Sequence, residues 1–186
     1  ADRYRRLERA LEATRPGSGG VLFLPWMSGS MAPRADERMR GGFLNVGLAS
    51  TRAELARAVL EGVALNLRWL RHPVERFAKR RLSHFVLYGG AAASDGWSQI
   101  MADVLDAPVH QLENPHFAVA AGAGLLAFQR LGLLGFDDIP GRLAVRREFT
   151  PNPAHRARYQ ALAAQFVRAF ERTRPVFRGL NAEASC

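Results

Sequence analysis

Two glycines, an alanine and a serine near the middle of the chain have the types and spacing of a turn that binds a phosphate-bearing ligand. The run Gly89-Gly90-Ala91 follows an apolar stretch, Phe85 to Tyr88, and Ser94 precedes a helical pattern. Glycine lets backbone amides approach a ligand closely, and the first residues of a helix offer unpaired N–H groups and partial positive charge. The sequence therefore predicts a buried strand, a glycine turn and a helix start that can hold such a ligand.

The glycine turn by itself leaves two interpretations open. It matches neither of the glycine-rich phosphate signatures, G-x-G-x-x-G and G-x-x-x-x-G-K-[ST]. A tight connection between a strand and a helix, without any ligand, is the commoner explanation of an isolated Gly-Gly-Ala.

Residues for other kinds of chemistry are scattered along the chain. The histidines show neither H-x-x-x-H nor H-E-x-x-H spacing, and no serine has a G-x-S-x-G setting. The sequence therefore predicts no metal site and no catalytic residue. Glu61 and Asn66 fall within an otherwise apolar helical pattern, and Asp103 lies within another helix, so we expect all three to be structural.

The composition suits one globular domain with an excess of positive charge. The chain has 186 residues, 48% of them hydrophobic, and a formal net charge of +9. Nearly all the basic residues are arginines, which makes nucleic-acid binding one alternative. Because these arginines are dispersed over expected helix faces without interleaved aromatic residues, we expect solvated helix surface rather than a nucleic-acid partner.

Targeting and redox features favour the cytoplasm. No run approaches the ~20 apolar residues of a membrane span, and no basic-then-apolar leader opens the sequence, so we expect no membrane partner. The single cysteine, Cys186, is the last residue, which rules out an intrachain disulfide and argues against a nucleophilic role. A reducing compartment is the simplest location for such a chain.

Apolar periodicity and turn residues predict the elements around the glycine turn. The expected elements, in chain order, are a helix over residues 2–14, strands over 21–24 and 43–46, a helix over 51–71, a strand over 85–88, a helix from 94, a strand over 109–112, a helix over 117–131, a strand over 143–149 and a helix from 152 to 174. The helix after the turn is expected to bury Trp97, Ile100, Met101, Val104 and Leu105, which share one face.

The predicted helix over 117–131 is unusually rich in small residues. Gly122 and Gly124 lie within it, although glycine in a helix costs about 1 kcal/mol against alanine. We therefore expect another backbone or a ligand to pass close to this helix, and tight helix packing is the first interpretation.

Two long helices are expected to end near prolines. Thr51 and Glu54 form a capping box that opens a helix to about Arg71, before a basic connection that contains Pro73. The final helix begins at Asn152-Pro153, and Pro175 is expected to end it, which leaves residues 175–186 as a terminal tail. Its expected buried face consists of Tyr159, Leu162, Phe166 and Phe170.

Several longer phrases accompany the glycine turn. Those before it are Leu24-Pro25-Trp26-Met27-Ser28-Gly29, Ala32-Pro33, Arg40-Gly41-Gly42-Phe43 and Arg57-Ala58-Val59-Leu60-Glu61-Gly62-Val63-Ala64. Those that include or follow it are Tyr88-Gly89-Gly90-Ala91-Ala92-Ala93-Ser94, then Trp97, Gln99-Ile100, Ala102-Asp103-Val104-Leu105, and Ala121-Gly122-Ala123-Gly124. In their order and spacing, the chain resembles the FGGY carbohydrate kinases over about residues 20–132, and it is most similar to their xylulokinase branch.

The resemblance implies an α/β fold of the ribonuclease-H-like, actin-like ATPase type. Residues 1–174 would form the C-terminal, ATP-side domain without its first strands. The implied reaction transfers the γ-phosphoryl group of ATP to a sugar hydroxyl, with Mg²⁺ as cofactor and a pentulose such as xylulose as substrate. The resemblance also implies that Gly89, Gly90, Ala91 and Ser94 hold the adenosine part of ATP. A homodimer is kept as one alternative for the assembly.

Two departures and several missing parts bear on activity. The loop after Ser28-Gly29 reads Ser30-Met31-Ala32-Pro33 where the family usually has Glu-Arg-x-Pro, and Asn114-Pro115-His116 stands where acidic residues are usual. The family's catalytic aspartate, most of its sugar contacts and its phosphate-loop hairpins precede the matched region. Phosphoryl transfer needs these parts together, so we expect the full-length parent to be an ATP-dependent kinase and this chain alone to be inactive. The alternative is a non-catalytic interaction domain with the same fold.

Overall fold

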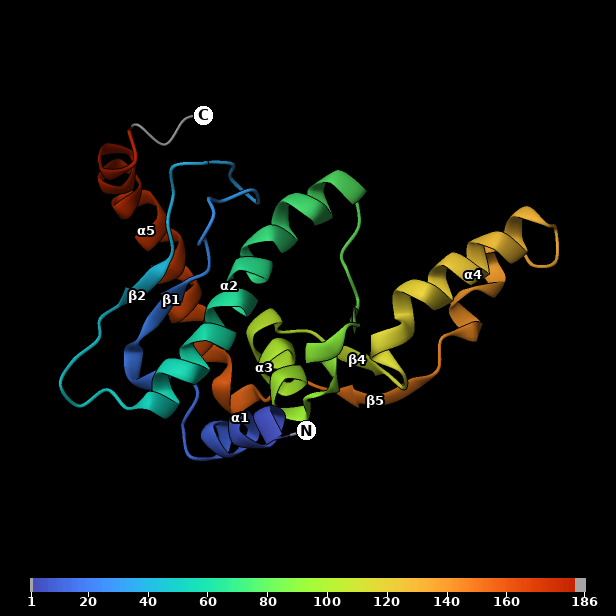
Figure 1. Ribbon diagram of the computed structural model, residues 1–186, viewed down its shortest axis with the longest axis horizontal. Helices are drawn as coiled ribbons and strands as arrows, with labels where there is room; N and C mark the ends of the chain where they lie inside the picture. The colour runs from blue at the N-terminus through green and yellow to red at the C-terminus, as the bar shows by residue number, and fades with distance from the viewer. Residues whose placement is uncertain (1, 183–186) are drawn as a thin grey trace.

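Helices and two small β-sheets make up the computed structural model, which describes residues 2–182 (Figure 1). The helices are α1 (Asp2–Glu12), α2 (Arg52–Ala78), α3 (Asp95–Leu105), α4 (Ala118–Arg130) and α5 (Arg156–Leu180). The strands are β1 (Leu22–Leu24), β2 (Gly42–Leu44), β3 (Phe85–Leu87), β4 (Val109–Leu112) and β5 (Val145–Phe149). Cys186, on which one prediction rests, lies outside the described residues.

The two sheets differ in strand direction. β1 and β2 form an antiparallel pair, whereas β3 runs parallel to β4, and β4 pairs antiparallel with β5. β4 is therefore the central strand of the larger sheet, and β3 and β5 form its edges among the described residues. Because β3 and β4 are parallel, the chain between them must cross over, and α3 is that crossover helix.

The long helix α2 connects the two sheets. It contacts β1, α1, α3 and α5, and the largest hydrophobic cluster includes residues of all five elements. Gly62 lies where α2 crosses β1, and a Cβ at this position would clash with the carbonyl oxygen of Phe23. The helix can therefore approach the strand this closely only because residue 62 is glycine.

The observed start and end of α2 can be compared with those predicted from the sequence. The capping box is confirmed, since Thr51 Oγ1 accepts from the Glu54 amide and the Glu54 carboxylate accepts from the Thr51 amide. The expected end near Arg71 is wrong, because α2 continues through Pro73 to Ala78. Arg71 donates to the Glu75 carboxylate and to the Leu105 carbonyl, both at 2.8 Å, and these bonds hold the turn around the proline.

The predicted buried face of α5 is confirmed at every position. Its buried residues are Tyr159, Leu162, Phe166 and Phe170. The expectation that Pro175 ends the helix is wrong, because α5 runs to Leu180. Arg174 and Arg178 lie on either side of the proline and both bind Asp36, which holds the last turns of the helix in place. The division of the chain at residue 174 stays a prediction.

Three polar residues that the sequence predicts to be structural make hydrogen bonds that join different segments of the chain. Glu61 accepts hydrogen bonds from the adjacent residues Gly17 and Ser18 and from Tyr159, and Asn66 accepts one from the indole of Trp26 at 3.2 Å. Asp103 accepts from the Asn152 amide at 2.8 Å and bonds the His155 ring at 2.7 Å, which ties α3 to the start of α5. These contacts satisfy buried polar atoms that would otherwise destabilise the fold.

A buried aspartate clamps the long loop between β1 and β2 onto α5. The backbone of Asp36 pairs with that of Ser30, and its carboxylate accepts from Arg174 at 2.7 Å and from Arg178 at 2.9 Å. Burial acts to raise the pKa of Asp36, but hydrogen bonds from Arg174, the Arg38 amide and Arg178 outweigh it, so the pKa lies below its ordinary value of 3.8.

This lowered pKa predicts a defined pH dependence of stability. The unfolded chain binds a proton at Asp36 more readily than the folded chain, so the contribution is fully present above pH 3.8 and is lost as the pH falls through the folded pKa. Asp36→Asn is expected to lower the free energy of unfolding by about 1–2 kcal/mol at pH 7, with allowance for the partly exposed arginines. Urea denaturation of both proteins between pH 7 and pH 3 measures this difference, which should shrink only at the acidic end. A difference that stays constant to pH 3 would contradict the assignment.

Candidate functional site

The glycine turn lies between β3 and α3, as predicted. The residue whose conformation requires glycine is Gly89, with φ 88° and ψ 177°, whereas Gly90 is not among the residues with positive φ. Gly90–Ala93 form one turn of 3-10 helix, and α3 begins directly after it. Ala91 is exposed and Gly90 is half-buried, so the turn meets solvent.

Two backbone donors of the turn have no partner within the described chain. Among residues 2–182, no carbonyl and no side chain accepts a hydrogen bond from the amides of Gly90 and Ala91. The start of α3 follows, so the positive end of its dipole adds to these donors. The arrangement can therefore donate hydrogen bonds to oxygen or nitrogen atoms of a ligand.

Ser94 occupies a different position from the other three predicted residues. It is 4% exposed, its hydroxyl accepts from the Trp97 amide at 3.0 Å and it donates to Glu8 of α1. The serine thus caps α3 and ties it to α1. The structure brings Gly89, Gly90 and Ala91 to the surface and places Ser94 beneath them, while contact of all four with a nucleotide stays a prediction.

The helix that follows the turn is fixed in the core. The expected buried face is confirmed, because Trp97, Ile100, Met101, Val104 and Leu105 are all buried. The turn therefore stands on a rigid support at its C-terminal side.

The strand before the turn is not buried as predicted. Val86 is 39% exposed and Tyr88 is 65% exposed. β3 is an edge strand among the described residues, so no neighbouring strand covers its outer side. The prediction of a buried strand is therefore wrong for the part of the fold that the structure describes.

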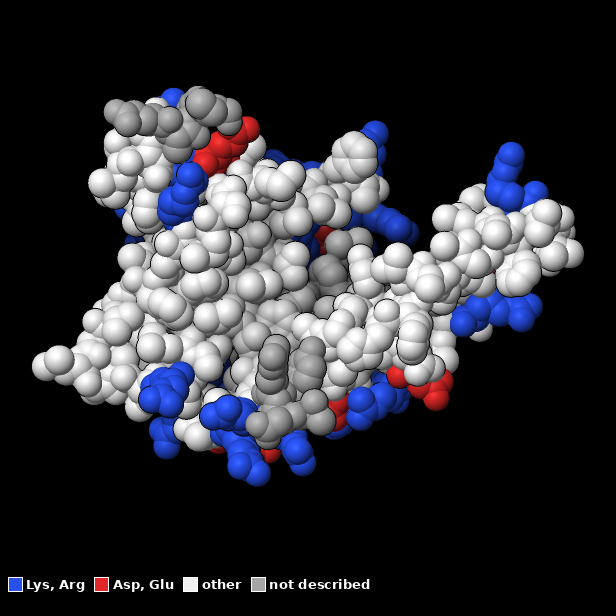
Figure 2. Space-filling model, in the orientation of Figure 1, with Lys and Arg blue, Asp and Glu red and all other residues white. Residues whose placement is uncertain are grey.

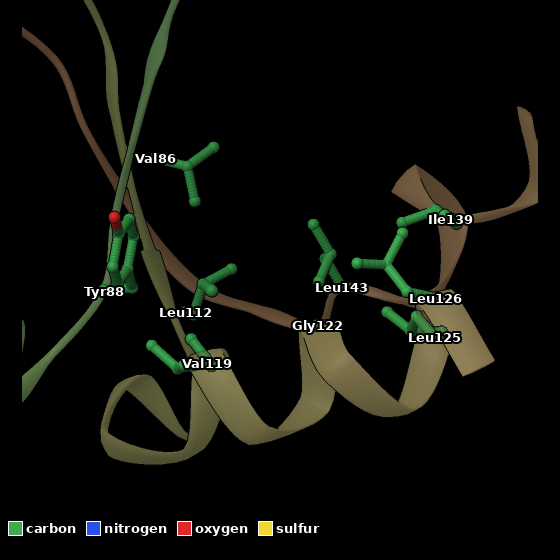
Figure 3. Close-up of a pocket in the computed structure, with 10 residues that line it drawn as sticks. Val86, Tyr88, Leu112, Val119, Gly122, Leu125, Leu126, Ile139 and Leu143 are labelled. Carbon is green, nitrogen blue, oxygen red and sulfur yellow. The ribbon is translucent and has the colours of Figure 1, made fainter. Parts of the chain in front are cut away.

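An apolar groove of about 440 Å³ lies beside β3. Figure 3 shows Val86 of β3, Tyr88 directly after that strand, Leu112 of β4 and side chains of α4 around it. α4 projects from the rest of the molecule (Figure 1), and none of its residues is buried. A Cβ on Gly122 or Gly124 would meet nothing within 4 Å. The expected tight packing of this helix is therefore wrong within residues 2–182.

Sequence reasoning missed two groups that hold the turn. The carbonyl of Pro115 accepts from the Gly89 amide at 2.7 Å, and the side-chain amide of Gln111 donates to the Ala92 carbonyl at 2.6 Å. Gln111 is the one polar residue with a fully buried side chain in β4. A glutamine within a predicted strand was the available signal, but its partner could not be read from its position.

Charges near the turn are paired rather than free for a metal ion. Asp95, at the first position of α3, binds Arg147 at 3.0 Å and Arg146 at 3.7 Å. Within residues 2–182, no three His, Cys, Asp or Glu side chains are grouped so that they could hold a metal ion. In Figure 2, Lys and Arg lie at separate points along the outline of the visible face instead of forming one patch.

Among residues 2–182, no helix is both long enough and apolar enough to span a membrane.

A family profile matches residues 1–130 of the chain. Its description is the C-terminal domain of the FGGY family of carbohydrate kinases. The matched region contains the glycine turn, α3, β4 and α4.

Two curated proteins illustrate the range of similar sequences. The chain is 26% identical to the xylulose kinase of Staphylococcus epidermidis over 164 residues, which cover 87% of the chain and 33% of that protein. It is 35% identical to the glycerol kinase of Aromatoleum aromaticum over 169 residues, which cover 89% of the chain and 33% of that protein. The chain thus spans about a third of the length of these relatives.

A solved structure shows the same architecture. The gluconate kinase of Lactobacillus acidophilus matches with a TM-score of 0.77 and 26% identity, over 91% of the chain and 34% of that protein. This likeness confirms the predicted partial α/β fold of the actin-like ATPase type.

Proposed function

Because the chain belongs to the FGGY family of carbohydrate kinases, we propose that it is the C-terminal, ATP-binding portion of a kinase that transfers the γ-phosphoryl group of ATP to a sugar hydroxyl. The observation that carries the proposal is the surface turn Gly89-Gly90-Ala91, which lies between a strand and a helix. The backbone amides of Gly90 and Ala91 in this turn have no partner within the described chain. Unpaired N–H groups at the start of a helix can donate hydrogen bonds to oxygen or nitrogen atoms of such a ligand.

For the sugar, we propose a pentulose such as xylulose. The support is that several relatives, from Staphylococcus epidermidis among others, are named xylulose kinases, and that the longer phrases agree best with that branch. A cytoplasmic location and a homodimer stay predictions.

We propose further that this chain alone does not transfer phosphate. It spans about a third of its relatives, and phosphoryl transfer requires several parts that position the substrate and stabilise charge together. The open apolar faces of β3 and α4 are the surfaces that the remainder of a parent protein would cover. Mg²⁺ would supply charge stabilisation in that parent.

Titration with ADP, followed by amide NMR shifts, tests the adenosine assignment. The amides of Gly89, Gly90 and Ala91 are expected to shift at millimolar ADP, and the experiment is repeated with the full-length parent, in which the cleft is complete. If none of these amides moves in either protein, the assignment fails.

Two glycine-to-alanine variants distinguish an effect on ADP binding at the turn from a general loss of folded protein. Gly90 does not have positive φ, so Gly90→Ala adds a Cβ without the backbone strain that Gly89→Ala would cause. We expect Gly90→Ala to weaken ADP binding about tenfold, equivalent to about 1.4 kcal/mol. Gly124→Ala, on the open face of α4, adds the same methyl group where nothing lies within 4 Å and should leave binding unchanged.

A further inference from the structure

Gln111 lies in the middle strand of the larger sheet and is completely buried. Its Nε2 donates to the carbonyl oxygen of Ala92 at 2.6 Å and approaches Oδ1 of Asp95 at 3.2 Å. Ala92 belongs to the glycine turn and Asp95 opens α3, so one side chain of β4 contacts both parts of the candidate site.

The orientation of the Gln111 amide follows from its partners. A carbonyl oxygen and a carboxylate oxygen can only accept, so the NH₂ group must face them. The other end of the amide, Oε1, is buried and accepts no hydrogen bond from residues 2–182. An apolar side chain of similar length would fill the same space without an unpaired oxygen. What the glutamine adds is therefore its donor to the turn.

The turn is held at two points from the β4 side. The carbonyl of Pro115, shortly after β4, accepts the Gly89 amide at one end, and Gln111 donates to the Ala92 carbonyl at the other. Arg147 of β5 lies opposite Gln111 in the sheet and binds the same Asp95 carboxylate at 3.0 Å. Between these points, the amides of Gly90 and Ala91 remain free to meet a ligand.

We propose that Gln111 is a positioning residue, which holds the Gly89–Ala93 turn in its ligand-binding shape before a nucleotide arrives. This proposal rests on the proposed function, because the ligand in question is the adenosine part of ATP. The physical reason is preorganisation: a turn that is already ordered loses less conformational freedom when it binds.

Amide hydrogen exchange of the unliganded chain tests the proposal without any nucleotide. The amides of Ala92 and Ser94 donate to Gly89 and Ala91 within the turn and report its order. In Gln111→Met, which keeps the length and removes the donor, we expect these two amides to exchange about tenfold faster relative to core amides of α5. Gln111→Asn is the second variant, since it keeps the donor on a side chain that is one methylene too short to reach Ala92.

Val109→Ala is the matched control for lost stability. Val109 is fully buried in the same strand, where it pairs with Phe85 and Phe149, so this variant lowers stability without removing the Gln111 donor. Equal acceleration of the turn amides in Gln111→Met and Val109→Ala, after normalisation to the α5 amides, would overturn the proposal.

ADP affinity of the same proteins then links turn order to binding. We expect Gln111→Met to bind ADP about tenfold more weakly, while Val109→Ala binds as the wild type does at temperatures where both are folded. A loosened turn with unchanged ADP affinity would also overturn the positioning role. If wild-type chain and parent both fail to bind ADP, the proposed function fails, and the exchange experiment still decides whether Gln111 holds the turn.

Discussion

Replacement of Glu61 by alanine is expected to lower the free energy of unfolding by about 3–5 kcal/mol, the range for removal of one partner of a buried ion pair. Glu61 is almost completely buried and accepts four hydrogen bonds at 2.8 Å. Their donors are the Gly17 amide, the Ser18 hydroxyl, Arg57 Nε and the Tyr159 hydroxyl. The carboxylate thus joins the turn after α1, α2 and α5, and alanine would leave all four donors unpaired.

Protonation states favour this network throughout the neutral range. Burial raises the pKa of Tyr159, and the neighbouring Glu61 carboxylate raises it further, so the phenol remains a donor. Arg57 is buried as well and would retain its charge after Glu61→Ala, without the carboxylate that compensates it.

Urea denaturation of three variants measures the effect and its origin. Tyr159→Phe removes one of the four donors and is expected to cost about 0.5–1.5 kcal/mol. Glu12→Ala removes an exposed glutamate at the end of α1 and is expected to change stability by less than about 0.5 kcal/mol. A loss in Glu61→Ala no larger than that in Glu12→Ala would show that the network does not stabilise the fold.

Replacement of Phe166 by alanine is the second large expected effect, again about 3–5 kcal/mol. Phe166 is fully buried in α5, with its ring centre 5.2 Å from that of Trp26 and 6.5 Å from that of Trp69. Trp26 comes from the loop after β1 and Trp69 from α2, so the ring joins three segments that are distant in sequence. Truncation would open a cavity that these large, rigid neighbours could fill only in part.

Phe77→Ala is the matched control for this truncation. Phe77 lies near the end of α2 and is 91% exposed, so the same change removes little packing there. Thermal unfolding, followed by near-ultraviolet circular dichroism, reports both stability and the packing of the tryptophans. Similar unfolding temperatures for the two variants would contradict the view that the aromatic cluster carries much of the core.

Much of the local structure could be predicted from residues three or four positions apart. The Thr51–Glu54 box and the buried faces of α3 and α5 depend on such short spacings, and all three predictions are confirmed. The two wrong helix ends have a different cause. Proline disfavours a helix locally, but contacts from distant segments held α2 through Pro73 and α5 through Pro175.

Some features of the candidate site could likewise be predicted from local sequence, whereas others depend on distant contacts. The sequence by itself determined the glycine turn, its place between a strand and a helix, and a family resemblance, because these depend on residues adjacent in the chain. The tertiary structure decided which glycine has positive φ, that Ser94 lies beneath the surface, and that Gln111 holds the Ala92 carbonyl.

The physical reason is that contacts between residues far apart in the chain produce no periodic pattern in the sequence. Glu61 and Tyr159 are 98 residues apart, and neither residue's local pattern identifies the other as its partner. Exposure of β3 and α4 likewise depends on what packs against them, so strand and helix patterns could predict that these elements form but not whether they are covered. Local spacing determined the elements of this protein, and only the three-dimensional arrangement decided which side chains they bring together.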